Sequence, residues 1–202
     1  MLRIGLTGGI ASGKSAVAVL LRDMGFPVLD ADSLAHKLIE PGQPAYEEVQ
    51  REFGPGIADA QGRIDRGKLA AIVFADREKL DRLNAIVHPR VSELVFRQFD
   101  EWARQGTRDA AFVEAALLIE SGIHKHLDGL VVAWCTPEQQ LERLAARGLS
   151  EAEARRRIAA QMPVEEKLRL ATEKIDCSGS LEQTREQVRA LASKLRRAPA
   201  AR

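Results

Sequence analysis

Apolar positions near the start of the chain switch between strand-like and helix-like spacing. The run from Leu2 to Thr7 is short, mostly apolar and followed by glycines, which predicts a buried parallel strand. Residues 14–24 have helical spacing and end near Gly25. Residues 27–30 (PVLD) predict a second short strand, and residues 31–40 return to a helical pattern. This order of elements predicts a parallel sheet with right-handed crossovers.

The middle of the chain has a different pattern. From Gln43 to about Gln105 the spacing is mostly helical, with one turn-rich break at residues 53–63 (FGPGIADAQGR). We interpret this stretch as a helical insertion between strands. His88 precedes Pro89 in this stretch, and we expect a helix to end there because proline cannot donate a helical hydrogen bond.

The strand pattern resumes after the insertion. Apolar or β-compatible runs predict three further strands, at residues 109–115, 129–134 and 174–176. Thr136 and Pro137 suit the N-cap and first position of a helix. The segment 138–170 is rich in Glu, Arg and Ala, with breaks at Gly148 and Pro163, and predicts short, exposed, mobile helices. The fold class that follows is α/β, with helices flanking a parallel sheet.

Composition narrows the possible partners and compartment. The 202 residues carry 30 basic and 29 acidic side chains, a net charge of +1, which argues against bulk electrostatic binding of nucleic acid or membrane. Cys135 and Cys177 are far apart in sequence and suggest neither a disulfide framework nor a structural zinc site. No signal-peptide pattern or apolar run of transmembrane length is visible. We expect a cytoplasmic protein that is a monomer or a weak homo-oligomer.

The loop after the first strand carries the strongest chemical signal. The stretch GGIASGKS matches G-x-x-x-x-G-K-[ST] at every fixed position, between a predicted strand and a predicted helix. Glycines let backbone N–H groups turn toward phosphates, and a helix N-terminus adds partial positive charge. Lys14 would reach the β- and γ-phosphates, and Ser15 would hold Mg²⁺. We expect a nucleoside triphosphate to bind at Gly8, Gly9, Ile10, Ala11, Ser12, Gly13, Lys14, Ser15 and Ala16.

Three carboxylates are candidates for a catalytic or Mg²⁺-binding role beside the phosphates. Asp30 and Asp32 fall where the second strand ends, at the edge of a parallel sheet that commonly binds ligands. A carboxylate there could orient a substrate hydroxyl, accept its proton or hold Mg²⁺ through water, although aspartate is also a good helix N-cap. Glu114, at the end of the strand 109–115, could support Mg²⁺ indirectly or be an ordinary strand-end glutamate. Which of these lies nearest Mg²⁺ stays open.

Arginines gather in the segment 138–170. Arg143 and Arg147 are spaced i, i+4, so on one helical face they could act together on a transferring phosphoryl group. A mobile segment carrying them would also exclude water from ATP. Arg155 and Arg156 are more simply explained as pairing with glutamates on a solvated helix face.

Several separated blocks together resemble one family, the dephospho-coenzyme A kinases. The blocks are IGLTGGIASGKS, VLDADSLAHKLIEPG, GRIDRGKLAAIVFAD, LNAIVHPRV, ALLIESGIHKHLD, EQQLERLAARGLSEAEARRRIAAQMPVEEK and IDCSGSLEQTREQV. The resemblance implies a P-loop core like that of nucleoside monophosphate kinases. This core would comprise residues 1–42, 107–137 and 171–202, with an acceptor-binding helical domain at 43–106 and a lid at 138–170.

The resemblance also implies a reaction and roles for individual residues. ATP, with Mg²⁺ as cofactor, would phosphorylate the ribose 3′-hydroxyl of dephospho-coenzyme A. Asp32 would be the base or orient the hydroxyl, and Lys14, Arg143 and Arg147 would complete the catalytic set. The residues implied to bind the acceptor are Asp32, Arg66, His88, Leu117, Leu118 and Glu120. Cys177 stands where the family usually has an asparagine, and a thiol is a poor replacement for an amide that contacts adenine.

Three alternatives to this interpretation can be weighed on the sequence. Another small-molecule kinase on the same core, of nucleotide or shikimate type, would share the loop; the helical insertion and the HP block favour the dephospho-coenzyme A kinase family, and a panel of acceptors would decide. A regulatory GTPase would usually carry an N-K-x-D loop, whereas the sole asparagine here is Asn84, in LNAI. A non-catalytic nucleotide-binding scaffold would have no need of Asp32 or the lid arginines.

Overall fold

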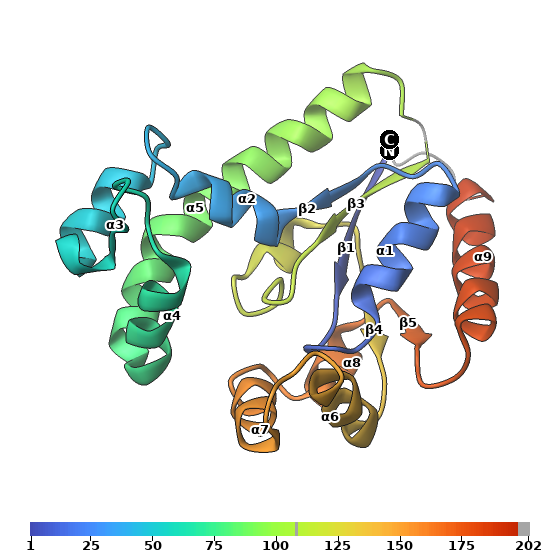
Figure 1. Cartoon of the computed structure of the whole chain (residues 1–202). Coiled ribbons are helices and arrows are strands. Elements are labelled where there is room, and N and C mark those ends of the chain that lie inside the picture. The colour runs from blue at the N-terminus through green and yellow to red at the C-terminus, as the bar shows by residue number, and fades with distance from the viewer. Residues whose placement is uncertain (108, 198–202) are drawn as a thin grey trace. The chain divides into compact units, whose positions relative to one another are not determined.

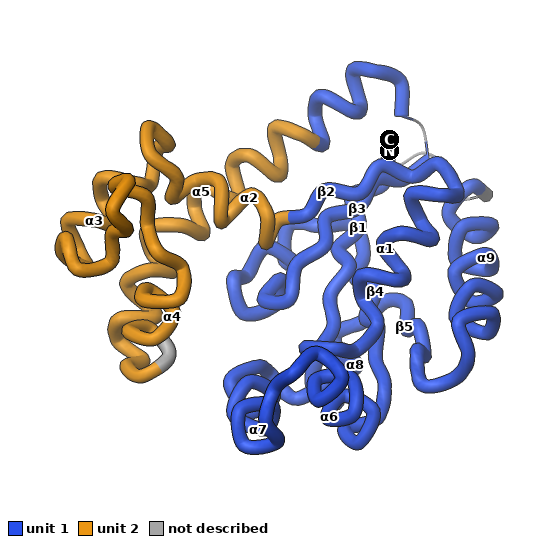
Figure 2. The backbone as a smooth tube through the Cα atoms, viewed as in Figure 1, with its two compact units in different colours: residues 1–30, 99–202 blue, residues 31–98 orange. Residues whose placement is uncertain are grey.

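The computed structural model describes residues 1–107 and 109–197 of the chain (Figure 1). The chain forms two compact units, residues 1–30 with 99–202 (unit 1) and residues 31–98 (unit 2), coloured separately in Figure 2. Among the described residues, no helix is both long enough and apolar enough to cross a membrane.

Unit 1 is built on a parallel β-sheet. In the described residues it has five strands in the order β2-β3-β1-β4-β5. Their bounds are β1 (Leu2–Thr7), β2 (Val28–Asp30), β3 (Ala110–Glu114), β4 (Gly129–Trp134) and β5 (Glu173–Asp176). Every neighbouring pair is parallel, which confirms the predicted sheet and α/β class. The central strand β1 lies between β3 and β4, so the loop that follows it emerges at the middle of the carboxyl edge.

Helices cover this sheet because alternate strand residues are apolar on each face. The helices of unit 1 are α1 (Lys14–Asp23), η2 (Ile123–His126), α6 (Pro137–Ala145), α7 (Glu151–Ala159), α8 (Val164–Leu170) and α9 (Leu181–Arg197). Helices α1 and α9 lie side by side against one face of the sheet (Figure 1). Leu6, Phe112 and Val131 point into the core under these helices and are at most 1% exposed.

The residues one step along each strand face the other way. A Cβ added to Gly5 would lie 2.4 Å from Leu118 Cδ2 and 2.9 Å from Leu127 Cδ1, so this position has room only for glycine. Leu118 is therefore packed against the back of β1. The chain between β3 and β4 serves as part of the core of unit 1.

Unit 2 is helical. Its elements are α2 (Ala31–Leu38), α3 (Tyr46–Phe53), η1 (Pro55–Ile57), α4 (Arg66–Ala75) and the greater part of α5 (Arg77–Arg104). Val49, Ile57 and Val95 are fully buried and form part of its core. The helical pattern predicted for the middle of the chain is confirmed. The compact unit spans residues 31–98, compared with residues 43–106 in the expected division.

Helix α5 continues through Pro89, so the expected helix end at this position is wrong. Proline deprives the carbonyl four residues earlier, that of Ala85, of its helical partner. Beside this gap, Arg90 Nη1 donates to the Ile86 carbonyl and Arg90 Nη2 donates to Glu48 Oε2 at 2.5 Å. Val91 is buried, and its packing also favours a continuous helix.

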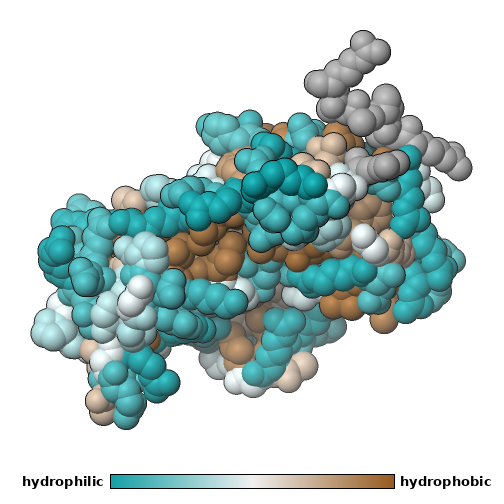
Figure 3. Space-filling model, turned by 90° about the horizontal axis from the view of Figure 1, so that it is seen from above, coloured by the Kyte–Doolittle hydropathy of each residue, from teal (hydrophilic) through white to brown (hydrophobic). Residues whose placement is uncertain are grey.

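Polar side chains cover much of the face drawn in Figure 3. Among the described residues, the large apolar side chains that are exposed are Val19, Leu170 and Leu181, between 48% and 57% exposed. They belong to three different helices, α1, α8 and α9. Single exposed apolar residues of this kind are ordinary on the surface of a folded protein.

A capping box fixes the start of α6. The Thr136 hydroxyl accepts from the Gln139 N–H at 3.3 Å, and Gln139 Oε1 accepts from the Thr136 N–H at 3.2 Å, which confirms the predicted N-cap. Gln139 Nε2 also donates to the Ser178 carbonyl at 2.6 Å. The cap therefore joins the end of β4, the start of α6 and the turn after β5.

Removing this cap is expected to destabilise unit 1. Thr136→Ala loses the side-chain acceptor and should lower the free energy of unfolding by about 1 kcal/mol, measured by urea denaturation. Thr136→Ser keeps the acceptor and serves as the control, with a much smaller change. Equal stability of the alanine variant and the wild type would show that the capping box contributes nothing measurable.

Candidate active site

The loop from Gly8 to Gly13 passes so close to the sheet that side chains are excluded at several positions. A Cβ on Gly8 would lie 2.3 Å from the Ala133 carbonyl oxygen, and one on Gly9 would lie 2.7 Å from Gln140 Nε2. Gly13 has φ of 101°, and a Cβ there would lie 2.7 Å from Cys177 Cβ. Gly8 is thus required by its contact with the backbone, and Gly13 by both sterics and backbone conformation, whereas the contact at Gly9 is with the movable end of the Gln140 side chain.

Helix α1 begins directly after this loop. Among the described residues, no side chain caps its N-terminus at Gly13, and its first turn has no acidic residue. The N–H groups and partial positive charge of such a helix end favour an anion such as phosphate. Lys14 is the first residue of the helix and Ser15 the second, so both belong to this anion-binding end.

Side chains from the segment 138–170 hold the middle of the loop. Gln161 Oε1 accepts from the Ile10 N–H at 2.7 Å, and Gln140 Nε2 donates to the Ile10 carbonyl at 2.7 Å. Arg143 Nη1 donates to the Ala11 carbonyl at 3.0 Å. Neither glutamine was identified from the sequence, because glutamine in a polar helical segment carries no pattern that distinguishes a tertiary contact from solvent exposure.

Glu114 lies beside Lys14 at the edge of the sheet. It is 5% exposed, its Oε1 accepts from Arg22 Nη2 at 2.9 Å, and its Oε2 is 3.5 Å from Lys14 Nζ. Asp30 on β2 is in register with Glu114 on β3, so the two carboxylates are neighbours across parallel strands. Arg22 was not expected here; it comes from the last turn of α1 and holds one of the two carboxylate oxygens of Glu114.

The donors around the loop fit a magnesium ion that is held largely by phosphate and water. Glu114 Oε2 is buried and, among the described residues, accepts no hydrogen bond, its contact with Lys14 being a longer ion pair. No cluster of three or more His, Cys, Asp or Glu side chains in that part of the chain could ligate a metal directly. Mg²⁺ commonly keeps several waters and takes one or two protein oxygens beside the phosphates. The Ser15 hydroxyl and the Glu114 carboxylate suit this pattern.

The two predicted lid arginines occupy different environments. Arg143 lies on α6 and donates through Nη2 to the Cys177 carbonyl at 2.7 Å, in addition to its bond to Ala11. Helix α6 ends at Ala145, so Arg147 lies in the following turn and is exposed. The expectation that both arginines share one helical face is corrected, because Gly148, with φ of 84°, closes the helix in a tight turn.

The segment after β3 contains three residues that the resemblance assigned to acceptor binding. Leu117 is half-buried, whereas the Leu118 side chain is fully buried against β1. In this structure the Leu118 side chain supports the turn from behind, and its assignment to acceptor binding stays a prediction. Glu120 Oε1 accepts from Lys167 Nζ at 2.9 Å and from the Met162 N–H at 3.2 Å.

Lys167 is an unexpected member of this region. Its side chain is 0% exposed, and its ammonium group also donates to the Ala116 carbonyl at 2.9 Å. A buried ammonium requires such partners, because an unpaired buried charge is strongly unfavourable. Lys167 therefore fixes both ends of the turn from Ala116 to Glu120.

Cys177 is packed beneath the phosphate loop. It is 4% exposed and lies against Gly13, and burial raises the pKa of its thiol to about 11. The thiol is therefore neutral at physiological pH. In this structure Cys177 fills space under the loop, and its carbonyl accepts from Arg143.

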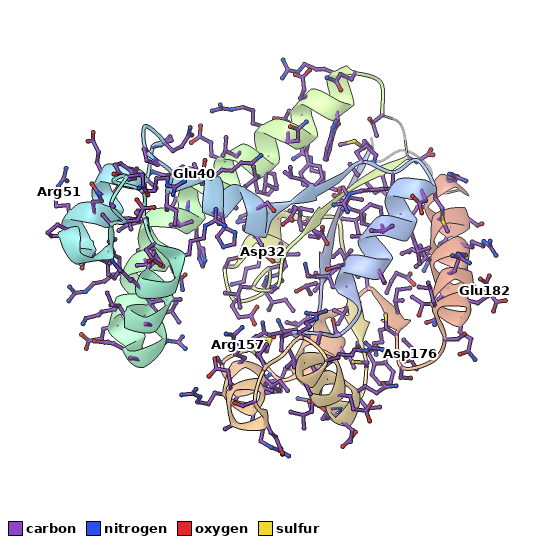
Figure 4. All side chains as sticks on the ribbon, in the orientation of Figure 1. Asp32, Glu40, Arg51, Arg157, Asp176 and Glu182 are labelled. Atoms are coloured by element: carbon purple, nitrogen blue, oxygen red, sulfur yellow. The ribbon has the colours of Figure 1, made fainter. Side chains whose placement is uncertain are left out.

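Asp32, Arg66 and His88 belong to unit 2. Asp32 lies in the first turn of α2 (Figure 4), two residues after Asp30, so the chain itself limits their Cα separation to about 7 Å. Arg66 begins α4, and its Nη2 is 3.7 Å from Glu40 Oε1. His88 is half-buried on α5, and desolvation lowers the pKa of its imidazole.

Comparison with known proteins supplies the family. A family model described as dephospho-CoA kinase matches residues 2–183. A dephospho-CoA kinase from Symbiobacterium thermophilum is 49% identical over 188 residues, which are 93% of this chain and 78% of that protein. The dephospho-CoA kinase of Aquifex aeolicus is 45% identical over 200 residues, which are 98% of this chain and 100% of that protein.

Solved structures agree with these matches. A crystal structure from Thermus thermophilus has a TM-score of 0.81 and 39% identity, covering 96% of this chain and 97% of that one. A dephospho-CoA kinase from Campylobacter jejuni has a TM-score of 0.70 and 28% identity, with 95% and 96% covered. A shikimate kinase from Acinetobacter baumannii, at 12% identity and a TM-score of 0.51, shares the fold alone, with 96% and 92% covered. The chain belongs to the dephospho-CoA kinase family.

Proposed function

We propose that this chain transfers the γ-phosphate of ATP to the ribose 3′-hydroxyl of dephospho-coenzyme A, giving coenzyme A and ADP. The observation that carries the proposal is the loop Gly8–Ser15, in which glycines and an uncapped helix N-terminus form an anion-binding site in a chain of this family. In the reaction, the 3′-oxygen bonds to the γ-phosphorus as the bond from that phosphorus to the β–γ bridging oxygen breaks. The hydroxyl proton passes to a carboxylate.

On the donor side, Lys14 supplies a positive charge that stabilises the phosphoryl group during transfer. Its ammonium lies 3.5 Å from Glu114 Oε2, which keeps it at the edge of the sheet beside the loop. Ser15 and Glu114 are the residues we assign to Mg²⁺, which when bound neutralises phosphate charge. Residues Gly8 to Ala16 contact the nucleotide in this proposal.

On the acceptor side, Asp32 is the proposed base. It follows Asp30 by two residues, so the chain keeps it near the end of β2, where Asp30 is in register with Glu114 on β3. Arg66 is suited to an anionic group of the acceptor, because its contact with Glu40 is long and both side chains are more than half exposed. His88, kept neutral by its lowered pKa, can donate or accept a hydrogen bond.

The segment 138–170 is the proposed lid over the phosphates. Arg147 is exposed on the turn after α6, where it could reach an incoming phosphate. Arg143 already contacts two carbonyls of the site and contributes its charge next to the loop. We further propose that the protein acts in the cytoplasm as a monomer or weak homo-oligomer.

An acceptor panel separates this proposal from other kinases of the same fold. With ATP and Mg²⁺, a coupled assay of ADP release should show turnover with dephospho-coenzyme A and far less with adenosine, AMP or shikimate. The physical reason is that binding energy from the remote parts of a correct acceptor lowers the barrier at its hydroxyl. Comparable turnover with AMP or shikimate would assign the chain to a different acceptor.

Replacing Asp32 tests the assignment of the base. Asp32→Asn keeps the size of the side chain but cannot accept a proton, and should lower kcat by roughly 10²-fold or more while ADP affinity stays near that of the wild type. Asp23→Asn, at the exposed end of α1, is the matched control. Turnover of Asp32→Asn close to the wild-type value would remove Asp32 from the mechanism.

A further inference from the structure

The most constrained part of the phosphate loop is the pair Ile10–Ala11. Ala11 has φ of 58°, a left-handed conformation that residues other than glycine rarely adopt and that costs free energy. Such a conformation persists only where the surroundings hold it in place. Three side chains do so here, and we call them the loop clamp: Gln140, Arg143 and Gln161.

The loop clamp satisfies the backbone on both sides of the strained residue. Gln161 accepts from the Ile10 N–H and Gln140 donates to the Ile10 carbonyl, each at 2.7 Å. Arg143 donates to the Ala11 carbonyl at 3.0 Å, and Cys135 Sγ lies 3.7 Å from the same oxygen. The peptide groups before and after Ala11 Cα are thereby oriented by side chains that lie far away in sequence.

The two glutamines hold Ile10 from different elements. Gln140 is 6% exposed on α6, whose start is fixed by the Thr136 capping box. Gln161 follows α7, in the turn before α8. The next residue in that turn, Met162, donates its N–H to Glu120 Oε1 at 3.2 Å, and Glu120 is paired with the buried Lys167. The position of Gln161 is thus anchored independently of its contact with the loop.

We propose that Gln161 is a positioning residue that, together with Gln140, holds the phosphate loop in its nucleotide-binding conformation and links the proposed lid to that loop. The proposal rests on the nucleotide-binding part of the proposed function. Gln161 need not touch the reacting atoms. It acts through Ile10 and Ala11, and its loss leaves the loop to spend part of its time in conformations that cannot surround a phosphate.

The first test is nucleotide affinity in Gln161→Met, which keeps the side-chain length and removes the acceptor. Calorimetric titration with ADP in Mg²⁺ buffer should show a Kd raised roughly 3- to 10-fold, the scale of one net hydrogen bond. KM for ATP should rise more than kcat falls, and the Ile10 amide should exchange with solvent faster by a similar factor. Gln105→Met, which removes a glutamine bonded to Glu101, is the control and should change none of these.

The second test asks whether Gln161 acts by holding the strained Ala11. Glycine adopts a left-handed conformation without the steric cost of alanine. The fold-loss in ADP affinity caused by Gln161→Met should therefore be smaller in the Ala11→Gly background than in the wild-type background. An equal fold-loss in both backgrounds would overturn the proposed mechanism of action.

The outcomes also separate this inference from the proposed function. Wild-type protein that binds ADP, with Gln161→Met binding it equally well or more tightly, contradicts the positioning role alone. Wild-type protein that binds no ADP would contradict the nucleotide-binding assignment itself. ADP binding without turnover on dephospho-coenzyme A would overturn the acceptor assignment and leave the role of Gln161 standing.

Discussion

The close approach of the phosphate loop to the ends of β4 and β5 is the constraint on which the site depends. The loop passes over the Ala133 carbonyl at Gly8 and over Cys177 at Gly13, with no room for a Cβ at either position. Because the main chain lies so close to the sheet, α1 starts directly at the sheet edge, and its first N–H groups can face the proposed phosphate site. Lys14 and Glu114 then meet at the same edge.

A second consequence of this geometry is that the loop needs support from outside itself. Ala11 in a left-handed conformation carries a cost of about 1–3 kcal/mol. The supporting bonds come from α6 and from the turn between α7 and α8. The segment proposed to cover the nucleotide and the loop proposed to bind it are thus joined within one unit. Three further arginines of that segment, Arg155 to Arg157, pair with Glu151 and Glu153 on the surface, as weak solvent-exposed contacts.

The strands and the phosphate loop could be predicted from the sequence because their signals are local. Short apolar runs with strand-like spacing predicted all five strands, and the fixed positions of GGIASGKS predicted the loop between β1 and α1. Contacts between distant segments could not be predicted in the same way. Gln140, Gln161 and Arg22 are ordinary polar residues in sequence, and only the fold brings them to Ile10 and Glu114.

One local signal was outweighed by tertiary packing. Pro89 normally ends a helix, but burial of neighbouring side chains such as Val91 favours a continuous α5, and Arg90 adds contacts to Ile86 and Glu48. The Leu118 side chain fills the space that Gly5 leaves behind β1, a contact that its sequence block did not indicate.

The most direct test of the account is a crystal structure of the protein with ADP and Mg²⁺. We expect the β-phosphate to lie within hydrogen-bond distance of the backbone N–H groups from Gly13 to Ser15, with Ala11 still at positive φ. A nucleotide bound away from this loop, or an Ala11 that moves to negative φ when ADP binds, would contradict the claim that the loop is built in advance for phosphate.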